Sequence, residues 1–248
     1  MRLAVALAAC LMGFGFGCSD DESTQPATTT SGTGAGGTGA GGQGATAAVN
    51  LMVIGLDGNP LEDVEVCDDG ASPANCQTSD TSGVVSLDLP ADVELTLRME
   101  KTGHMTRLAP IETVPNLHLL YYQVMVTKAE ASAFAQALGV TMDDSKGWVA
   151  FSLISQDAPA VAATLSPPSG DGPFYYDATL TPLPQATEIP AGGGALFMNV
   201  DPGTPTLGFG PGAPGCAFFS EAWGTDADAT PVRIEANTHT GVMDLECQ

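Results

Sequence analysis

The sequence has little positive charge. It contains 7 Lys and Arg against 29 Asp and Glu in 248 residues, a formal net charge of −22. Such a surface repels both the phosphates of nucleic acids and the anionic headgroups of membranes. We therefore expect no nucleic-acid partner, and any membrane attachment must have a source other than electrostatics. The acidity itself is typical of a device for solubility.

Sequence signatures of catalysis are missing as well. No Gly-x-Ser-x-Gly, His-Glu-x-x-His, Walker A or Cys-x-x-Cys pattern occurs. The three histidines, His104, His118 and His239, are scattered along the chain, so candidates for a general base are scarce. The same scatter argues against a zinc site. We therefore expect a protein that is not an enzyme and that holds no cofactor.

An apolar run long enough to cross a bilayer, about 20 residues, is not found at the N-terminus. The run there, Leu3–Phe16, is shorter, follows the single cation Arg2 and ends at small residues. This order of charge, apolar run and small residues is typical of a secretory signal peptide. We expect residues 1–17 to be a signal peptide that is removed on export.

The residues before Cys18 carry a first resemblance. Phe14-Gly15-Phe16-Gly17 followed by Cys18 resembles a lipobox, with Gly15 where a leucine is usual. The tidier Leu7-Ala8-Ala9-Cys10 would leave a signal that is too short. The resemblance implies a bacterial envelope lipoprotein anchored in the membrane by acyl chains, palmitate among them, on Cys18. The alternative is an ordinary soluble signal with an incidental cysteine.

Residues 18–47 predict a flexible tether behind this anchor. Ser19–Ala47 consists of a short acidic stretch and then Thr, Ser, Gly and Ala, with almost nothing apolar to bury. Ser19, rather than Asp, follows Cys18, which under the sorting logic of enteric lipoproteins favours the outer membrane. We expect an outer membrane lipoprotein whose head faces the periplasm or the cell surface.

From Ala48 onward the sequence predicts an all-β head. Short alternating apolar runs are separated by Gly, Pro and Asp turns, which indicates a β-sandwich or barrel. The predicted strands are Val49–Leu56, Val64–Val66, Val84–Leu89, Val93–Met99, His118–Val126, Trp148–Ile154, Val161–Leu165, Ala195–Val200, Val232–Ala236 and Met243–Cys247. A capping box, Thr127 with Glu130, predicts one short helix at Thr127–Leu138. Residues 201–216, rich in Pro and Gly, predict a long irregular loop.

Four cysteines remain in the head once Cys10 and Cys18 are set aside. An even number in an oxidising compartment indicates disulfide bonds, and four cysteines allow three pairings. The sequence favours Cys67–Cys76 and Cys216–Cys247, because each pair lies within one half of the head. Each bond would contribute about 2–4 kcal/mol to stability.

A second resemblance covers residues 48–126. The turn Asp57-Gly58-Asn59-Pro60 and the later Thr78-x-Asp80-x-x-Gly83 with its alternating strand and Leu89-Pro90 resemble the carboxypeptidase regulatory-like (transthyretin-like) domain. The resemblance implies a seven-stranded prealbumin-like sandwich without catalytic residues. In physical terms, Asp80 can accept a backbone N–H and Gly83 can adopt φ > 0. We interpret residues 127–146 as a short helix and connector, and residues 147–248 as a second β-rich domain. One interpretation of this second domain is a degenerate repeat of the first.

Ligand-binding candidates are few. Asp57 and Asp80 are possible calcium ligands, although calcium needs six to eight oxygens and no dense acidic loop is present. Tyr175, Tyr176 and Trp223, together with Tyr121-Tyr122, could stack on sugars if exposed, whereas alternating strands favour core positions for them. The leading hypothesis is a non-catalytic binding or structural head with an unknown protein or glycan ligand. The alternatives are a glycan- or calcium-binding surface adhesin and an accessory subunit of an exported enzyme.

The lipid anchor predicts a labelling result. Cells grown with a palmitate analogue should label the wild-type protein and leave Cys18→Ser unlabelled, because the substitution removes the acylated thiol. Detection after immunoprecipitation measures both forms, with Cys10→Ser as the matched control that keeps its label. Equal labelling of wild type and Cys18→Ser would contradict the assignment.

Overall fold

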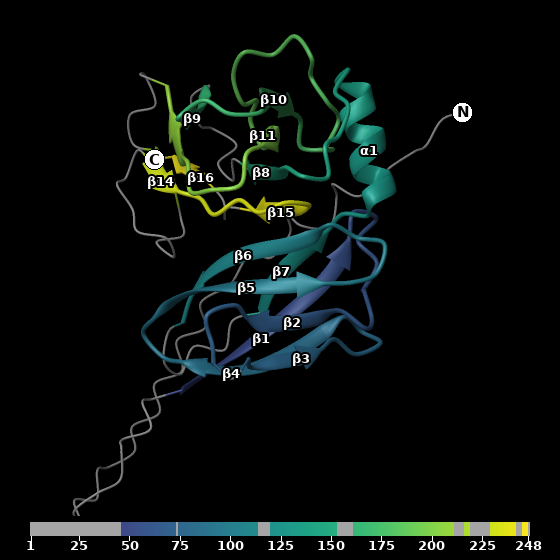
Figure 1. Cartoon of the computed structure of the whole chain (residues 1–248), viewed down its shortest axis with the longest axis vertical. Helices are drawn as coiled ribbons and strands as arrows, with labels where there is room; N and C mark the ends of the chain where they lie inside the picture. Colours follow the sequence, from purple (N-terminus) through teal and green to yellow (C-terminus); the bar gives the residue numbers. More distant parts are fainter. Residues whose placement is uncertain are drawn as a thin grey trace, which may run out of the picture.

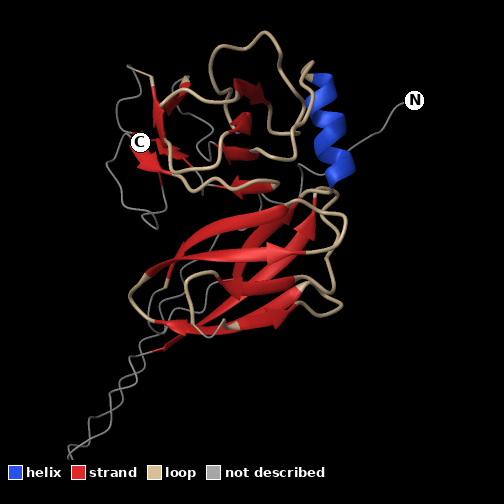
Figure 2. Cartoon of the chain, in the orientation of Figure 1, coloured by secondary structure: helices blue, strands red, loops and turns tan. Residues whose placement is uncertain are grey.

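The computed structural model describes residues 46–72, 74–113, 120–152, 161–210, 216–218, 229–241 and 245–247. The predicted signal peptide, Cys18, nearly all of the predicted tether, His118 and Trp223 lie outside the described residues. Within them the chain forms sixteen strands and one short helix, which confirms the predicted all-β fold class (Figure 2). No helix among the described residues has the length and apolar character needed to span a membrane.

Strands β1 to β7 form a two-layered sandwich (Figure 1). A three-stranded sheet of order β4-β1-β7 packs on the strands β6-β5-β2-β3, which are one half of an eight-stranded sheet. Seven is the number of strands that the resemblance implies. Their bounds are β1 Thr46–Gly55, β2 Glu65–Asp68, β3 Cys76–Thr78, β4 Val84–Pro90, β5 Glu94–Glu100, β6 Thr106–Glu112 and β7 Leu120–Met125.

Alternation in the sequence creates this first core. In β1, Val49, Leu51 and Val53 are buried, while the residues between them are less so. Side chains of the same kind from the other strands meet them. They are Val64, Val66, Val85, Leu87, Leu89, Leu97, Met99, Ala109, Ile111 and Met125. The dry interface between the two sheets therefore follows from the period of two that the sequence shows.

The turn chemistry that the sequence predicts around Asp80 is confirmed. Asp80 Oδ1 accepts hydrogen bonds from the backbone N–H groups of Ser82 and Val84, both at 2.9 Å. Gly83 adopts φ = +75°, and a Cβ there would lie 2.5 Å from the carbonyl oxygen of Val53. A side chain at this position would therefore push β1 away, so the glycine is required by both conformation and space.

A second sandwich follows the helix. Strands β10-β11-β8, the other half of the eight-stranded sheet, pack on a sheet of order β14-β12-β9. Phe151, Leu165, Phe197 and Leu207 are among the side chains buried between these layers. The bounds are β8 Gly147–Ser152, β9 Ala163–Ser166, β10 Asp171–Tyr176, β11 Gly194–Val200, β12 Thr206–Phe209 and β14 Ala229–Pro231. Strands β13 (Cys216–Phe218) and β16 (Leu245–Cys247) pair as a separate ribbon.

The predicted helix is confirmed as α1, Lys128–Ala137. Its capping box is complete: the Glu130 N–H donates to Thr127 Oγ1 at 3.1 Å, and Glu130 Oε2 accepts from the Thr127 N–H at 2.8 Å. The buried Ala131 and Ala135 pack with Trp148 and Leu196 on the outer face of β8 and β11. The helix therefore makes a third layer on the second sandwich, as Figure 1 shows.

One strand joins the two sandwiches into a continuous sheet. Strand β15, Thr238–Gly241, runs parallel to both β6 and β8 and pairs with each. The resulting order is β10-β11-β8-β15-β6-β5-β2-β3, in which β15 lies between the two halves (Figure 1). The relative position of the sandwiches is therefore set by backbone hydrogen bonds, not by a linker.

Seven of the sixteen strands were not predicted, namely β3, β6, β10, β12, β13, β14 and β15, and one predicted strand is wrong. The missed β6 contains Pro110, which lies beyond Thr106–Leu108, the stretch that pairs with β15, so its missing N–H is tolerated there. Strand β12 lies inside the predicted irregular loop 201–216. Strand β15 has no apolar alternation at all. By contrast, Val232–Ala236 is not a strand, although Ile234 forms an isolated bridge with Gly203.

A closed ring of four charged side chains reinforces the junction. Arg98 donates to Asp69 Oδ1 at 2.8 Å and to Glu235 Oε2 at 2.5 Å, and Arg233 donates to the second oxygen of each carboxylate. Burial alone would lower the pKa of Arg98, but the hydrogen bonds that it donates to Asp69 and Glu235 outweigh burial and raise the pKa. The ring ties β5 and the end of β2 to the segment that leads into β15.

The ring predicts a measurable stability difference. Arg98→Met keeps the aliphatic stem but leaves two carboxylates with one cation, so we expect the free energy of unfolding to fall by about 1–2 kcal/mol. The matched control is Lys146→Met, which breaks the more exposed Lys146–Asp201 pair and should lower the free energy of unfolding clearly less, because solvent screens an exposed pair. Urea unfolding followed by circular dichroism measures both. Equal losses would contradict a special role for the ring.

Candidate functional site

A cavity of about 290 Å³ lies where the two sandwiches and the helix meet. Its walls come from β6, β7, α1, β8, β10, β11 and β15, together with Leu56 and Leu180. It therefore exists only because β15 holds the two halves side by side. Its volume is close to the lower end of the range for small-molecule sites, which begins at about 300 Å³.

Strand β8 supplies the longest stretch of the cavity wall. Its side chains alternate: Trp148, Ala150 and Ser152 line the cavity, while Val149 and Phe151 belong to the core of the second sandwich, with Phe151 also reaching the cavity. Ala150 is partly accessible although its neighbours in the strand are buried. The small side chain at 150 thus leaves space that a larger residue would fill.

Most of the remaining wall is apolar and aromatic. Val126, Phe134, Tyr176 and Leu196 line it together with Trp148. The described residues include three exposed large hydrophobic side chains, and two of them, Tyr122 (53% exposed) and Leu180 (42%), also line this cavity. Exposed apolar side chains that gather at one opening are typical of a binding site.

One part of the wall is polar and is organised by Arg107. Its Nε donates to Gln123 Oε1 at 2.8 Å, and its Nη1 lies 3.4 Å from His239 Nδ1. The guanidinium lies against the backbone of Gly241, where any Cβ would collide with it. We call Arg107, Gln123 and His239 the polar end of the cavity. These residues come from β6, β7 and β15, so the polar end belongs to both the first sandwich and the joining strand.

His239 is held in its neutral form. Burial lowers the pKa of its imidazole to about 3, and the positive charge of Arg107 acts in the same direction. Although surrounded by protein, the ring keeps some accessibility because it borders the cavity. At neutral pH this residue is therefore a hydrogen-bonding group without charge, and a poor general base.

The candidate calcium ligands do not come together in a metal site. Asp57 accepts from the Asn59 N–H at 3.0 Å, and this bond lowers the pKa of its carboxyl. Asp80 is likewise engaged by Ser82, whose hydroxyl is the main cause of its lowered pKa. Neither belongs to a group of metal-ligating side chains among the described residues. Both act as turn residues, and a role in calcium binding stays a prediction.

The tyrosine candidates are separated by the fold. Tyr175 is buried in the second core, where its hydroxyl accepts from the Ala163 N–H at 3.2 Å and burial raises its pKa. It is not accessible for stacking on a sugar. Tyr176, also buried, lines the cavity and donates to the Phe151 carbonyl at 3.0 Å. Trp223 lies outside the described residues, so its role in ligand binding stays a prediction.

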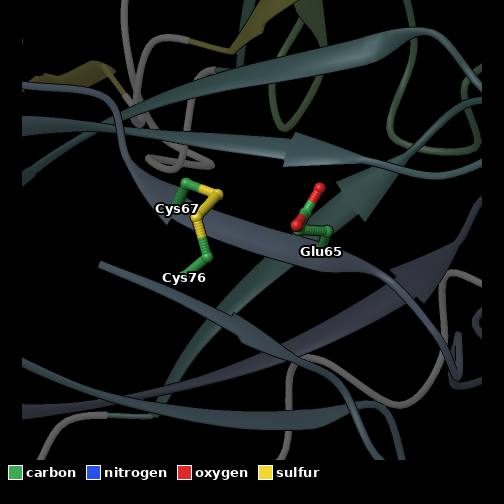
Figure 3. Close-up of side chains that lie close together, drawn as sticks. All are labelled: Glu65, Cys67 and Cys76. Atoms are coloured by element: carbon green, nitrogen blue, oxygen red, sulfur yellow. A yellow bond between two sulfur atoms is a disulfide. The ribbon is translucent and has the colours of Figure 1, made fainter. Parts of the chain in front are cut away.

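The first predicted disulfide is confirmed. Cys67 and Cys76 are opposite each other on β2 and β3 and are bonded, with Glu65 nearby on β2 (Figure 3). These three residues are the group of the described chain that could hold a metal, but the bonded sulfurs are not thiolate ligands. For the second pair, the backbones of Cys216 and Cys247 are opposite each other in β13 and β16. Their disulfide stays a prediction.

Sequence reasoning missed the residues of the polar end. Arg107, Gln123 and His239 are far apart in the sequence, and no motif or spacing connects them. Their only local signal is that polar side chains interrupt strands: Gln123 is 1% exposed within a hydrophobic strand. A buried glutamine of this kind indicates a polar partner inside the fold but does not identify it.

The neutral state of His239 predicts how stability depends on pH. The unfolded histidine gains a proton near pH 6.5 and the folded one only near pH 3, so folding loses stability as the pH falls through this window. Between pH 7.5 and pH 4.5, the free energy of unfolding of His239→Gln should fall by about 2 kcal/mol less than that of the wild type. Urea unfolding at both pH values measures this, and the shared carboxylates cancel in the comparison. An equal loss in both proteins would mean that His239 titrates normally.

No family model matches the sequence, and no curated protein matches it. Solved structures give distant similarities. The Bacillus anthracis TIE protein has a TM-score of 0.30 at 10% identity, over 82% of this chain and 34% of that one. A streptococcal ancillary pilin has a TM-score of 0.28 at 12% identity, over 84% of this chain and 64% of the pilin. The shaft pilin SpaA of Lactobacillus rhamnosus GG has a TM-score of 0.24 at 13% identity, over 82% of this chain and 98% of the pilin. The chain thus spans about a third of the first protein and just under two thirds of the second, and scores this low carry no conclusion about function.

Proposed function

We propose that this chain is an exported, lipid-anchored envelope protein whose head is a non-catalytic binding module, with the cavity between its sandwiches as the binding site. The observation that carries the proposal is the cavity itself, which joins an aromatic wall to a buried polar end. The lipid on Cys18, the tether of residues 18–47 and the outer membrane location belong to the proposal on the strength of the sequence patterns.

The support for binding is that the wall is rigid. Its residues come mainly from paired strands and from a capped helix, and such elements hold side chains more firmly than loops do. The ion-pair ring and β15 fix the two halves relative to each other. A preorganised apolar site loses little conformational entropy when a ligand binds.

The groups around the cavity do not support catalysis. His239, with its low pKa, would hold a proton poorly at neutral pH. The carboxylate of Glu130 is engaged in the capping box through Oε2. The hydroxyl of Tyr176 donates to a backbone carbonyl. Glu130 and Tyr176 therefore have structural tasks and His239 is a poor base, which favours a binding role.

A cavity-filling variant tests the proposal. Toluene added to the isotope-labelled head should shift backbone NMR signals of β8, β15 and α1, because it enters the apolar part of the cavity. Ala150→Phe fills that space and should weaken binding at least about tenfold, the scale of a lost buried ring contact. The matched control, Ala137→Leu on the exposed end of α1, should bind as the wild type does.

Two results would contradict the proposal. One is the absence of any toluene-dependent shift in the wild type. The other is equal binding by wild type and Ala150→Phe, which would place the probe elsewhere. The circular dichroism spectrum and unfolding midpoint of each variant show whether it is folded, so that a loss of binding is not mistaken for a loss of structure.

A further inference from the structure

We infer that the polar end of the cavity recognises a hydrogen-bond acceptor oxygen, so that the ligand is a small apolar or aromatic molecule carrying a carbonyl or carboxylate group. This inference rests on the proposed function, since it names the class of ligand for the same cavity. The geometry of two side chains, Gln123 and His239, carries it.

The first is the orientation of the Gln123 amide. A guanidinium has donors and no acceptor, so the Gln123 atom that faces Arg107 Nε at 2.8 Å must be the oxygen. This fixes the amide and directs its NH₂ group away from Arg107. The side chain is 1% exposed and lines the cavity. Among the described residues, the hydrogen bond of the Gln123 side chain is the one that Oε1 accepts from Arg107.

The second is the tautomer of His239. Because Arg107 Nη1 can only donate, Nδ1 of the histidine must be the acceptor in their 3.4 Å contact. A neutral imidazole with an accepting Nδ1 carries its proton on Nε2. Within the described part of the chain, the side-chain contact of His239 is the one that Nδ1 makes with Arg107. Arg107 thus contacts the acceptor atom of each neighbour, Gln123 Oε1 and His239 Nδ1. The donor groups of the two side chains are then left for a ligand in the cavity.

The result is an end of the cavity that offers donors. Two acceptors in the wall are engaged within the protein: Glu130 Oε2 accepts from Thr127 at 2.8 and 2.7 Å, and the Phe151 carbonyl accepts from Tyr176 at 3.0 Å. A ligand group that only accepts hydrogen bonds matches this arrangement, whereas an amine would meet donors. The inference does not need Arg107 to be free, because its part is to orient Gln123 and His239.

The rest of the ligand is limited by size and by the aromatic wall. A volume of about 290 Å³ is roughly twice that of an engineered apolar cavity of about 150 Å³ that binds benzene. One ring with a short substituent therefore fits beside Trp148 and Tyr176, and a polymer does not. A ring against this wall can have its oxygen at the polar end.

Three probes of similar size separate the possibilities. Toluene has no acceptor, acetophenone has a neutral carbonyl oxygen, and phenylacetate has a carboxylate. We expect one or both of the acceptor probes to bind about tenfold more tightly than toluene, since each hydrogen bond adds a factor of about three to ten. The tighter of the two shows whether the oxygen is neutral or anionic. Dissociation constants come from NMR titration of the labelled head.

Variants locate the effect. Gln123→Leu and His239→Phe each remove one donor, so each should reduce the preference for the acceptor probe over toluene at least about threefold. Retained toluene binding also shows that each variant is folded with its cavity intact. As the conservative variant, His239→Gln keeps an N–H donor and should restore part of the preference.

The outcomes distinguish the two proposals. If toluene binds as tightly as both acceptor probes, or if the preference survives both donor deletions, the inference about the ligand class is overturned and the binding site stands. If none of the three probes binds, the proposed function fails and the ligand class fails with it. A preference that depends on Gln123 and His239 supports both.

Discussion

The pairing of β15 with both β6 and β8 is the interaction on which the rest of the structure depends. The strand has four residues and a polar sequence, yet it is largely buried, because its backbone groups are bonded on both sides. Thr238 and Thr240 are buried as well, and their hydroxyls donate to the carbonyls of Glu235 and Arg233 at 2.8 and 2.6 Å. Without this strand the two sandwiches would be separate sheets, and the cavity between them would not form.

The distribution of positive charge follows the same constraint. In a chain with a net charge of −22, two acidic bodies repel each other when they are packed together. The three arginines of the described chain, Arg98, Arg107 and Arg233, all lie at the junction of those bodies. Two of them close the ring with Asp69 and Glu235, and the third orients the polar end of the cavity. The three arginines are therefore placed where the two acidic halves meet.

What the sequence predicted was local. The alternation of β1 and β4, the capping box at Thr127 and the turn at Asp80 depend on neighbours a few residues apart, and each is confirmed. The site could not be predicted in this way, because Arg107 and His239 meet only through the pairing of β6 with β15 across 132 residues. The strand that brings them together has no apolar alternation. Its position is fixed by its partners and not by its own sequence.

The location of the cavity explains why a sandwich fold alone says little about function. The cavity lies between the two cores and not within either of them, since each core consists of apolar side chains packed on one another. The space arises at the junction, where Ala150 and Gly241 are too small to close it and Arg107 prevents apolar packing. A ligand there would contact both halves and would bind the assembled head more tightly than separated ones. By linkage, whatever stabilises the junction also preorganises the proposed site, so the ion-pair ring would strengthen ligand binding without touching the ligand.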